Sequence, residues 1–495
     1  MSQHSMTTTN PFQVYNQRLV IAMVGLPARG KSYLSHVLLR YLNFVGCPCQ
    51  LFNAGNLRRE RGMAGADANF FDPTNSNAKQ QRDEMAMQCL DEVIAWIKSK
   101  TVARGCAVGI LDATNTTVAR RKKVMDRVKK ERDKCSTWTL IFVESIANEP
   151  KLLDQNYRMK LSNDDYKNSY DKQAALADFI ERVKQYETVY EPLSDEEQTS
   201  YIQLVNAGAK FISSNVDGYV MWKVQRLLGS VHIGPRTIWI GLVGQTENDL
   251  QGRLGGDASL TNAGIAYGKE MSNVINTREQ LTENDLSASA LNLNHVEPTL
   301  VLTGTLHRYA VMSSLLLNQN VDGTKTKQQQ HQFMTLAALN ELCAGDMSGL
   351  TNLELMKRFP KECDARAADK LNYRYPGVGG ESYIDLVARM NEIVCMLEQS
   401  RGNSIVICDR SVFRALMAYF LGKTIQELPF LHVKPGVLEL RRSWKGFSVT
   451  QLDVTIGKPT SIAGAGTEAI SDRSNYQKIF DLSHQCCVSD NNASF

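Results

Sequence analysis

The order of apolar runs and amphipathic stretches predicts alternating strands and helices in the first half of the chain. The apolar run at 18–25 ends in glycine, as a buried parallel strand often does. Residues 31–46 and 78–100 place their apolar side chains at helical spacing. Further strands are expected at 49–55, 106–114, 138–145 and 201–208. This alternation predicts an α/β domain with a parallel sheet.

The same alternation begins again after residue 236 and predicts a second α/β domain. Its strands are expected at 237–244, 298–304, 403–411 and 448–457. We expect the two domains to cover 17–230 and 236–457, with a linker around 228–236. Polar composition predicts a mobile tail at 1–16, a polar insertion at 318–330 and a disordered tail at 458–495.

Composition excludes several classes of protein. The net charge of +4 over 495 residues is small, and the densest basic stretch, 119–134, is interpreted as a solvated helix face, so no nucleic-acid partner is expected. No run of apolar residues is long enough for a membrane span, so no membrane partner is expected. The 11 cysteines lack metal-site spacing and predict reduced thiols in a cytoplasmic protein.

The segment "GLPARGKS" at 25–32 fits the phosphate-binding loop G-x-x-x-x-G-K-[ST] and lies between a predicted strand and a predicted helix. Backbone N–H groups of such a loop hold a triphosphate. Lys31 would neutralise the β- and γ-phosphates, and Ser32 would bind Mg²⁺. The ATP-binding residues of the loop would be Gly25, Leu26, Pro27, Ala28, Arg29, Gly30, Lys31 and Ser32. The alternative is a glycine-rich turn that holds no ligand.

Two further segments follow predicted strands, where an α/β domain carries its binding loops. Arg58 and Arg59 in "LRRE" suit a phosphorylated acceptor, although a surface charge cluster is an equal alternative. Asp112 in "LDATNTT" could bind Mg²⁺ through water or accept a hydrogen bond from a substrate hydroxyl. The alternative, a helix N-cap, suits Thr114 or Asn115 better than Asp112.

These segments resemble, in order and spacing, the 6-phosphofructo-2-kinase/fructose-2,6-bisphosphatase family. "MVGLPARGKSY", "FNAGNLRRE", "DATNTT", "FVESIANEP", "RMKLSNDDY" and "ERVKQYETVYEPL" are all similar to its kinase domain. The resemblance implies a P-loop kinase that transfers the γ-phosphate of ATP to the 2-hydroxyl of fructose 6-phosphate, with Mg²⁺ as cofactor. The product would regulate glycolysis, and the chain would form a homodimer. One departure is Ala147, where the family usually has cysteine.

The resemblance also assigns residues. Asp112 would lie near the reacting hydroxyl, and Lys160 would contact both ATP and the transfer site, so Lys31, Asp112 and Lys160 are the expected catalytic residues. Asn156 and Arg158 would line the nucleotide pocket. The sugar phosphate would be bound by Arg58, Arg82, Thr114, Arg120, Lys160, Arg182 and Tyr186, with Arg59 not ranked against Arg58.

From residue 237 onward, "GRLGGDASLTNAG", "LNELCAG", "RYPGVGGESYIDLVARM" and "IVICDRSVFRALMAYFLG" resemble the histidine-phosphatase half of the same family. That chemistry needs a nucleophilic His with an Arg before it, a second His, and a Glu that protonates the leaving oxygen. The Arg-His-Gly of the family falls on Leu242, Val243 and Gly244, and its second His falls on Asp409. The residues that remain are Glu341 as the acid, Arg253, Arg308 and Arg414 at phosphate positions, and Arg366 and Lys370 at the second phosphate.

We therefore expect a histidine-phosphatase-like α/β domain without activity. Valine cannot form a phospho-enzyme, and a carboxylate at Asp409 would repel a phosphoryl group by roughly 4 kcal/mol per unit charge at about 4 Å and an effective dielectric near 20. One alternative keeps both activities, with His307 or another residue as a surrogate nucleophile. Another is a non-catalytic metabolite-binding scaffold with both sites degenerate, against which the intact loop, Asp112 and Lys160 argue.

Overall fold

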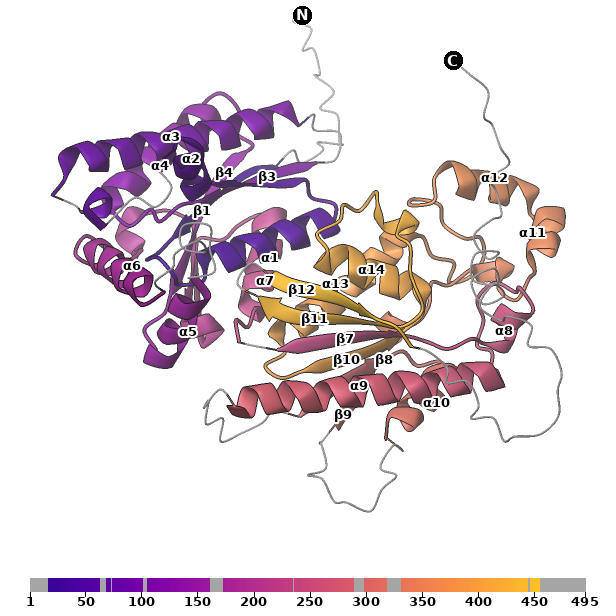
Figure 1. Cartoon of the computed structure of the whole chain (residues 1–495). Coiled ribbons are helices and arrows are strands. Elements are labelled where there is room, and N and C mark those ends of the chain that lie inside the picture. Colours follow the sequence, from indigo (N-terminus) through magenta and orange to yellow (C-terminus); the bar gives the residue numbers. More distant parts are fainter. Residues whose placement is uncertain are drawn as a thin grey trace, which may run out of the picture. The chain divides into compact units, whose positions relative to one another are not determined.

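Figure 1 shows a computed structural model of the chain. It describes residues 17–62, 68–72, 74–100, 105–160, 172–234, 236–288, 298–317, 331–443 and 446–454. The predicted tails and the predicted insertion at 318–330 lie outside these residues. The described residues form two compact units, one up to Gly234 together with Gly446, the other from Arg236 onward. Each unit has its own sheet, which confirms the prediction of two α/β units.

The sheet of the first unit has the strand order β2-β3-β1-β4-β5-β6. The strands are β1 (Gln17–Val24), β2 (Cys49–Asn53), β3 (Cys106–Asp112), β4 (Trp138–Ile146), β5 (Tyr201–Val205) and β6 (Lys210–Ser214). β1 to β5 pair in parallel, as predicted. β6 pairs antiparallel with β5 at the edge and was not predicted, because its five residues contain no fully buried position.

Helices cover both faces of this sheet (Figure 1). They are α1 (Lys31–Phe44), α2 (Ala54–Glu60), α3 (Ser76–Ser99), α4 (Val118–Arg132), α5 (Pro150–Lys160), α6 (Lys172–Glu187) and α7 (Tyr219–Ser230), with short 3-10 turns at η1 (Ala68–Phe71), η2 (Asp195–Glu197) and η3 (Asn206–Gly208). The apolar sides of α3 and α4 pack against Val20, Ala22 and Val24 of β1. Because side chains alternate along a strand, the other residues of β1 face α1 and α7.

The start of α4 corrects two expectations. The N-cap is Thr117, whose side chain accepts a hydrogen bond from the backbone N–H of Arg120 at 3.2 Å, so neither Thr114 nor Asn115 caps this helix. The basic stretch is also not solvated throughout. Arg121 is fully buried and donates from Nε and Nη2 to the carboxylate of Glu197, at 2.7 Å each. A bidentate partner far along the chain allows this charge to be buried.

The expectation that the cysteines are reduced thiols is contradicted at one pair. Cys47 and Cys106 form a disulfide with their Cα atoms 5.9 Å apart. The parallel pairing of β2 with β3 sets Cys49 opposite Val108, so the residues just before these positions also lie side by side. The two cysteines are 59 residues apart in sequence, and only the strand register brings them together.

The sheet of the second unit has the order β12-β11-β7-β10-β8-β9. The strands are β7 (Thr237–Leu242), β8 (Thr299–Thr303), β9 (His331–Thr335), β10 (Ser404–Cys408), β11 (Val437–Ser443) and β12 (Gly446–Leu452). β7, β10, β8 and β9 pair in parallel, whereas β11 is antiparallel to β7. The predicted strands correspond to β7, β8, β10 and β12, and β9 and β11 were not predicted.

Helices also cover both faces of the second sheet (Figure 1). They are α8 (Glu247–Leu250), α9 (Asn262–Ala288), α10 (His307–Leu317), α11 (Asn352–Arg358), α12 (Pro360–Ala368), α13 (Tyr383–Gln399) and α14 (Arg410–Phe420), with 3-10 turns at η4 (Ala337–Leu339), η5 (Gly345–Met347) and η6 (Leu428–Phe430). α9 and α10 pack on one face around Trp239, Met271 and Met312. α13 and α14 pack together on the other face.

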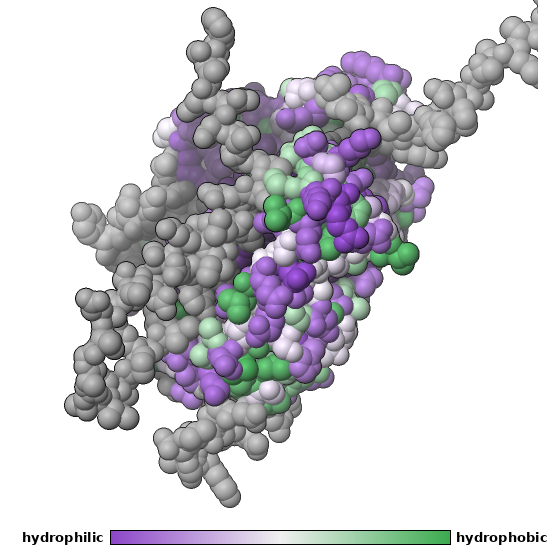
Figure 2. All heavy atoms as spheres, turned by 90° about the vertical axis from the view of Figure 1, so that its right-hand side faces the viewer, coloured by the Kyte–Doolittle hydropathy of each residue, from purple (hydrophilic) through white to green (hydrophobic). Residues whose placement is uncertain are grey.

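Figure 2 shows the face that carries α8, α11 and α12, where hydrophobic residues form separate spots on a mainly hydrophilic surface. The most exposed of the large apolar side chains are Val378, at 98%, and Leu353, at 80%. Single apolar residues of this kind are ordinary on a protein surface. In the described part of the chain, no helix combines the length and apolarity that crossing a bilayer needs.

Candidate functional site

The loop at 25–32 joins the end of β1 to the start of α1, at the carboxyl edge of the first sheet. Gly25 has a φ of 131°, and a Cβ there would lie 2.6 Å from the carbonyl oxygen of Ser145 in β4. Glycine is therefore required for the loop to approach the sheet this closely. Gly30 caps α1 with a φ of 92° and no side-chain hydrogen bond. This arrangement of loop and helix start is the one that phosphate-binding loops use.

The predicted lysine lies over this loop. Lys31 is buried, and its Nζ donates a 2.6 Å hydrogen bond to the carbonyl oxygen of Leu26. Ser32 follows in the first turn of α1 and is half-buried. Pro27 is buried, and Ala28 has a positive φ of 56°, so the backbone turns sharply between the two glycines.

Asp112 and Thr114 lie beside the loop because β3 is the neighbour of β1 in the sheet. Asp112 ends β3, is only 4% exposed, and accepts a 2.6 Å hydrogen bond from Nδ2 of Asn53. The carbonyl oxygen of Thr114 accepts a 2.9 Å hydrogen bond from the backbone N–H of Gly25. The structure thus brings the predicted lysine, serine, aspartate and threonine to one edge of the sheet.

Arg29, predicted to bind ATP, has partners on two helices. Its Nη1 donates to the hydroxyl of Tyr157 in α5, and its Nη2 pairs with Glu187 of α6, both at 3.1 Å. The side chain therefore ties the loop to α5 and α6. Asn156 of α5 is half-buried. The side chains of Arg158 and Lys160, at the end of the same helix, lie outside the described part of the chain.

Four predicted arginines lie near one another, three of them around the η1 turn and Arg120 close to Arg82. We call them the arginine cluster: Arg58 of α2, Arg82 of α3, Arg120 of α4 and Arg182 of α6. The guanidinium carbons of Arg58 and Arg182 lie 5.7 Å and 3.6 Å from the ring centre of Phe71. The ring of Tyr186, also predicted, lies 5.8 Å from the same phenylalanine. The guanidinium carbon of Arg82 lies 5.7 Å from the ring centre of Phe70, so residues from α2, α3 and α6 face this aromatic turn.

The charges of the arginine cluster are close enough to influence one another. Burial lowers the pKa of Arg82, and Arg182 lowers it further. Burial and the charge of Arg82 lower the pKa of Arg120 to about 10, against the opposing influence of Tyr186. Nε of Arg120 and Nε of Arg182 are buried and have no hydrogen-bond partner among the described residues. Buried like charges with unsatisfied donors are the environment that an anionic ligand would stabilise.

The structure separates the two neighbouring arginines that the sequence left unranked. Arg58 is 4% exposed and faces Phe71 in the cluster. Arg59 is half-buried and forms a hydrogen bond to Asn56 on its own helix. Only Arg58 is therefore a member of the cluster.

In the second unit, the position expected for a nucleophile is part of the apolar core. Val243 follows β7, is 6% exposed and packs with Trp239 and the residues of α9. Leu242 is 4% exposed. Gly244 has its backbone against Gly264, where a Cβ would lie 2.4 Å from the carbonyl oxygen. Neither side chain that replaces the expected Arg-His pair carries a group that could attack or bind phosphorus.

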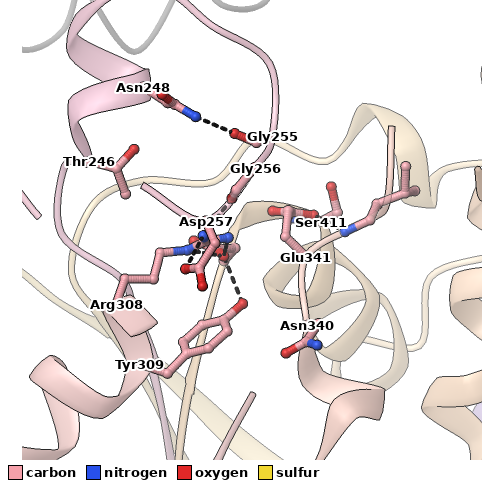
Figure 3. Close-up of polar contacts among 12 residues, drawn as sticks. Thr246, Asn248, Gly255, Gly256, Asp257, Arg308, Tyr309, Asn340, Glu341 and Ser411 are labelled. Atoms are coloured by element: carbon pink, nitrogen blue, oxygen red, sulfur yellow. Dashed lines mark hydrogen bonds and ion pairs between the residues drawn. The ribbon is translucent and has the colours of Figure 1, made fainter. Parts of the chain in front are cut away.

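Asp409, directly after β10, forms an ion pair with Arg308 of α10. Figure 3 shows Arg308 with Asp257 and Tyr309 around it. Oδ2 of Asp409 accepts hydrogen bonds from Nε of Arg308 at 2.9 Å, from Nη2 at 2.5 Å and from the hydroxyl of Tyr309 at 2.7 Å. Nη1 of Arg308 donates to the carbonyl oxygen of Gly256 at 2.8 Å. Every nitrogen of this guanidinium therefore already has a protein acceptor.

Burial and electrostatics act against each other at this pair. Burial raises the pKa of Asp409 to about 6, although Arg308 opposes the shift. The attraction of Asp409 raises the pKa of Arg308 despite burial, so the guanidinium stays charged. Burial and Asp409 also raise the pKa of Tyr309, which keeps its hydroxyl a neutral donor.

Glu341 lies close to this pair but bonds elsewhere (Figure 3). Its carboxylate accepts hydrogen bonds from the backbone N–H groups of Leu342 at 2.7 Å and Ser411 at 3.2 Å. His307 is exposed at the first position of α10, and its backbone N–H donates to Asp257 at 3.0 Å.

The other predicted phosphate contacts divide into two places. Arg414 donates to the carbonyl oxygen of Leu431 at 2.9 Å and to the hydroxyl of Tyr383 at 3.2 Å. Burial, together with the charges of Arg414 and Arg366, lowers the pKa of Lys370 to about 8, so these three cations lie near one another. Arg253 instead donates to the carbonyl oxygen of Gly349 at 2.7 Å, on a different loop.

Two contacts at these sites were not predicted. Asp83 of α3 forms an ion pair with Arg120 across 37 residues of sequence, and Tyr309 reaches Asp409 across 100 residues. Asp83 follows the predicted Arg82 directly, so the sequence could have marked it as a residue near the site. Nothing along the chain indicates that its partner is Arg120.

Comparison with known proteins matches both units to families. Residues 6–233 match the 6-phosphofructo-2-kinase family, and residues 301–452 match the histidine phosphatase superfamily, branch 1. Among solved structures, the α-ribazole phosphatase from Shigella flexneri is similar with 18% identity and a TM-score of 0.35 over 46% of this chain and 99% of that one. A similarity this low supports no conclusion by itself.

Three curated proteins are similar over most of the chain. A Caenorhabditis elegans 6-phosphofructo-2-kinase/fructose-2,6-bisphosphatase is 35% identical over 84% of this chain and 84% of its own length. The Homo sapiens 6-phosphofructo-2-kinase/fructose-2,6-bisphosphatase 3 is 34% identical over 84% of this chain and 73% of its own. The Saccharomyces cerevisiae 6-phosphofructo-2-kinase 1 is 34% identical over 82% of this chain, which spans only 48% of that relative.

Proposed function

The chain belongs to the 6-phosphofructo-2-kinase/fructose-2,6-bisphosphatase family, and we propose that it transfers the γ-phosphoryl group of ATP to the 2-hydroxyl of fructose 6-phosphate. The products are fructose 2,6-bisphosphate and ADP. The observations that support this proposal are the phosphate loop and the arginine cluster, which belong to the same unit. Nε of Arg120 and Nε of Arg182 are buried there and lack partners among the described residues, as expected of a site that a sugar phosphate completes.

Each half of the site has a distinct task. The backbone of the loop and Lys31 would hold the triphosphate. The arginine cluster would hold the 6-phosphate of the sugar, because guanidinium groups bind phosphate through two parallel hydrogen bonds. Asp112, fixed by Asn53, would orient the 2-hydroxyl toward the γ-phosphorus. Catalysis would then depend on positioning and charge neutralisation rather than on a strong base.

The residues at this edge also fit the Mg²⁺ that accompanies ATP. A hydroxyl at Ser32 and a buried carboxylate at Asp112 are hard oxygen donors of the kind that Mg²⁺ prefers. When bound, the ion would neutralise charge on the phosphates. Thr114 and Tyr186 would contribute hydrogen bonds to the sugar, and Lys160 would contact both substrates, as the resemblance implies.

We further propose that the second unit does not hydrolyse the product. Val243 has no lone pair with which to attack phosphorus. Asp409 bonds to Nε and Nη2 of Arg308, so its carboxylate takes the place that phosphoryl oxygens would need. A phosphate entering the site would have to displace that carboxylate and would meet a second one, Asp257, 3.6 Å from Nη1.

Two assays on the full chain test these proposals. ADP formation from ATP should depend on fructose 6-phosphate and should yield an acid-labile fructose bisphosphate. If fructose 6-phosphate stimulates no ATP turnover, the kinase proposal fails. If there is no turnover at all but the sugar phosphate still binds, a metabolite-binding scaffold becomes the better account.

The second assay uses fructose 2,6-bisphosphate labelled at the 2-phosphate. We expect neither released phosphate nor labelled protein. Labelled protein that disappears in the variant His307→Ala would instead identify His307 as a surrogate nucleophile and the chain as bifunctional.

A further inference from the structure

The carboxylate of Asp83 lies beside the arginine cluster and forms an ion pair with one of its members. Asp83 follows Arg82 on α3, and its Oδ1 forms an ion pair with Nη2 of Arg120 on α4. Its Oδ2 pairs with Nζ of Lys123, one helical turn further along α4, at 2.7 Å. The side chains of Asp83 and Arg120 are 25% and 14% exposed, so this pair is more protected than most ion pairs on a protein surface.

Arg120 needs a carboxylate partner because burial and the nearby charge of Arg82 both disfavour a charged guanidinium at this position. The guanidinium is buried beside Arg82, and both effects lower its pKa to about 10. Repulsion from Arg82 favours a rotamer that turns away from the cluster. Asp83 holds Nη2 and leaves Nε, which is buried and has no partner among the described residues. Nη2 of the guanidinium is thereby fixed, and Nε remains available to a bound anion.

We propose that Asp83 is a positioning residue for the sugar-phosphate site, which aims Arg120 at the phosphate of the acceptor. This inference rests on the proposed kinase function and adds to it a residue that does not itself contact the substrate. Asp83 would lower the KM for fructose 6-phosphate by keeping Arg120 in its binding orientation before the sugar arrives. The turnover of the bound complex would depend on it little, because no reacting atom contacts Asp83.

The chain contains a matched control. Asp91, two helical turns after Asp83 on α3, also bridges to α4, where its Oδ1 accepts a 2.7 Å hydrogen bond from Nε of Arg127. The variant Asp91→Asn therefore removes a bridge between the same two helices without touching the arginine cluster. A second control, Lys123→Gln, removes the other partner of Asp83 and leaves its bond to Arg120.

The test measures KM for each substrate, kcat, and sugar-phosphate binding by calorimetry in the full-length protein. Asp83→Asn should raise the KM for fructose 6-phosphate about ten- to fiftyfold, the loss expected for one misaligned charged donor. The KM for ATP should stay within about twofold, and kcat within about threefold. Asp83→Glu should recover part of the loss. Asp91→Asn and Lys123→Gln should resemble the unmodified protein.

Other results would overturn the inference. One such result is that Asp83→Asn and Asp91→Asn change the KM for fructose 6-phosphate equally. Another is that Asp83→Asn raises the KM values for ATP and for fructose 6-phosphate by the same factor. Either result would mean that Asp83 only joins two helices. The proposed function can fail separately. A chain that binds fructose 6-phosphate without phosphorylating it would contradict the kinase proposal. The dissociation constants of Asp83→Asn and Asp91→Asn for the sugar phosphate would still test whether Asp83 positions Arg120. A chain that neither binds nor phosphorylates the sugar would contradict both.

Discussion

The arginines of the two candidate sites differ in how many of their donors the chain itself already pairs. In the first unit, Nε of Arg120 and Nε of Arg182 have no partner among the described residues. In the second unit, Arg308 donates from all its nitrogens to Asp409 and to the carbonyl oxygen of Gly256. An arginine whose acceptors belong to the chain stabilises the fold, whereas one left with a free donor can bind an anion. The comparison teaches that retained arginines are not evidence of retained binding.

The largest expected effect tests whether the first unit uses its cations for chemistry. Lys31→Met should lower kcat by roughly a thousandfold or more, because the charge on the transferring phosphoryl group loses its lysine. Methionine is close to lysine in volume, so the circular dichroism spectrum should not change. Lys184→Met, on the exposed side of α6, serves as the control. If Lys31→Met still turned over at a comparable rate, the loop would have another role.

The next effect tests the ion pair of the second unit. The pKa of Asp409 is raised from its ordinary value of 3.8 to about 6, so the folded protein binds this proton more tightly than the unfolded chain does. The associated stability is fully present below about pH 4 and is lost as pH rises through 6. The stability of the unmodified protein relative to Asp409→Asn should therefore fall by up to about 3 kcal/mol between pH 4 and 7. Chemical denaturation at several pH values measures this difference.

A relative stability that increases with pH would contradict this prediction. It would mean that attraction to Arg308 outweighs burial in the folded state, with the pKa of Asp409 below its ordinary value. Because both proteins share every other titrating group, the comparison between them isolates the carboxylate at this position.

A smaller effect distinguishes two adjacent arginines of the first unit. Arg58→Ala should raise the KM for fructose 6-phosphate about ten- to hundredfold, since a charged hydrogen bond to phosphate contributes about 1.5–3 kcal/mol. Arg59→Ala should change it by less than about threefold, because Arg59 bonds to Asn56 on its own helix. Steady-state kinetics at saturating ATP provides the measurement. Equal effects of the two variants would show that the burial of Arg58 does not decide which arginine binds the sugar phosphate.

The smallest effect distinguishes the stability of α4 from the binding role of the arginine that it carries. Thr117→Ala removes the N-cap of α4, the helix that carries Arg120, and should lower the free energy of unfolding by about 1 kcal/mol. The KM for fructose 6-phosphate should change by no more than about twofold at a temperature well below unfolding. A large increase in KM with unchanged stability would instead assign the start of α4 to the binding site.

The sequence by itself determined the two α/β units and the place of the phosphate loop, because both depend on local order. An apolar strand, a glycine-rich turn and an amphipathic helix follow one another along the chain, and each part has its own periodicity. The strands β6, β9 and β11 were not predicted, because hydrogen bonds to neighbouring strands, and not their own pattern, hold them in the sheet. The loss of a nucleophile at Val243 was also readable from the sequence, since it needed only the identity of one residue.

Only the tertiary structure decided which charges meet. The disulfide between Cys47 and Cys106 depends on the register of β2 with β3. The N-cap of α4 is Thr117 and not Thr114 or Asn115, because the extended chain after β3 continues up to Thr117 before the helix begins. Asp83 reaches Arg120, and Asp409 reaches Arg308, across 37 and 101 residues. Such pairs form when separate helices and strands pack together, and the energy of an ion pair depends on distance and burial, neither of which is encoded locally along the chain.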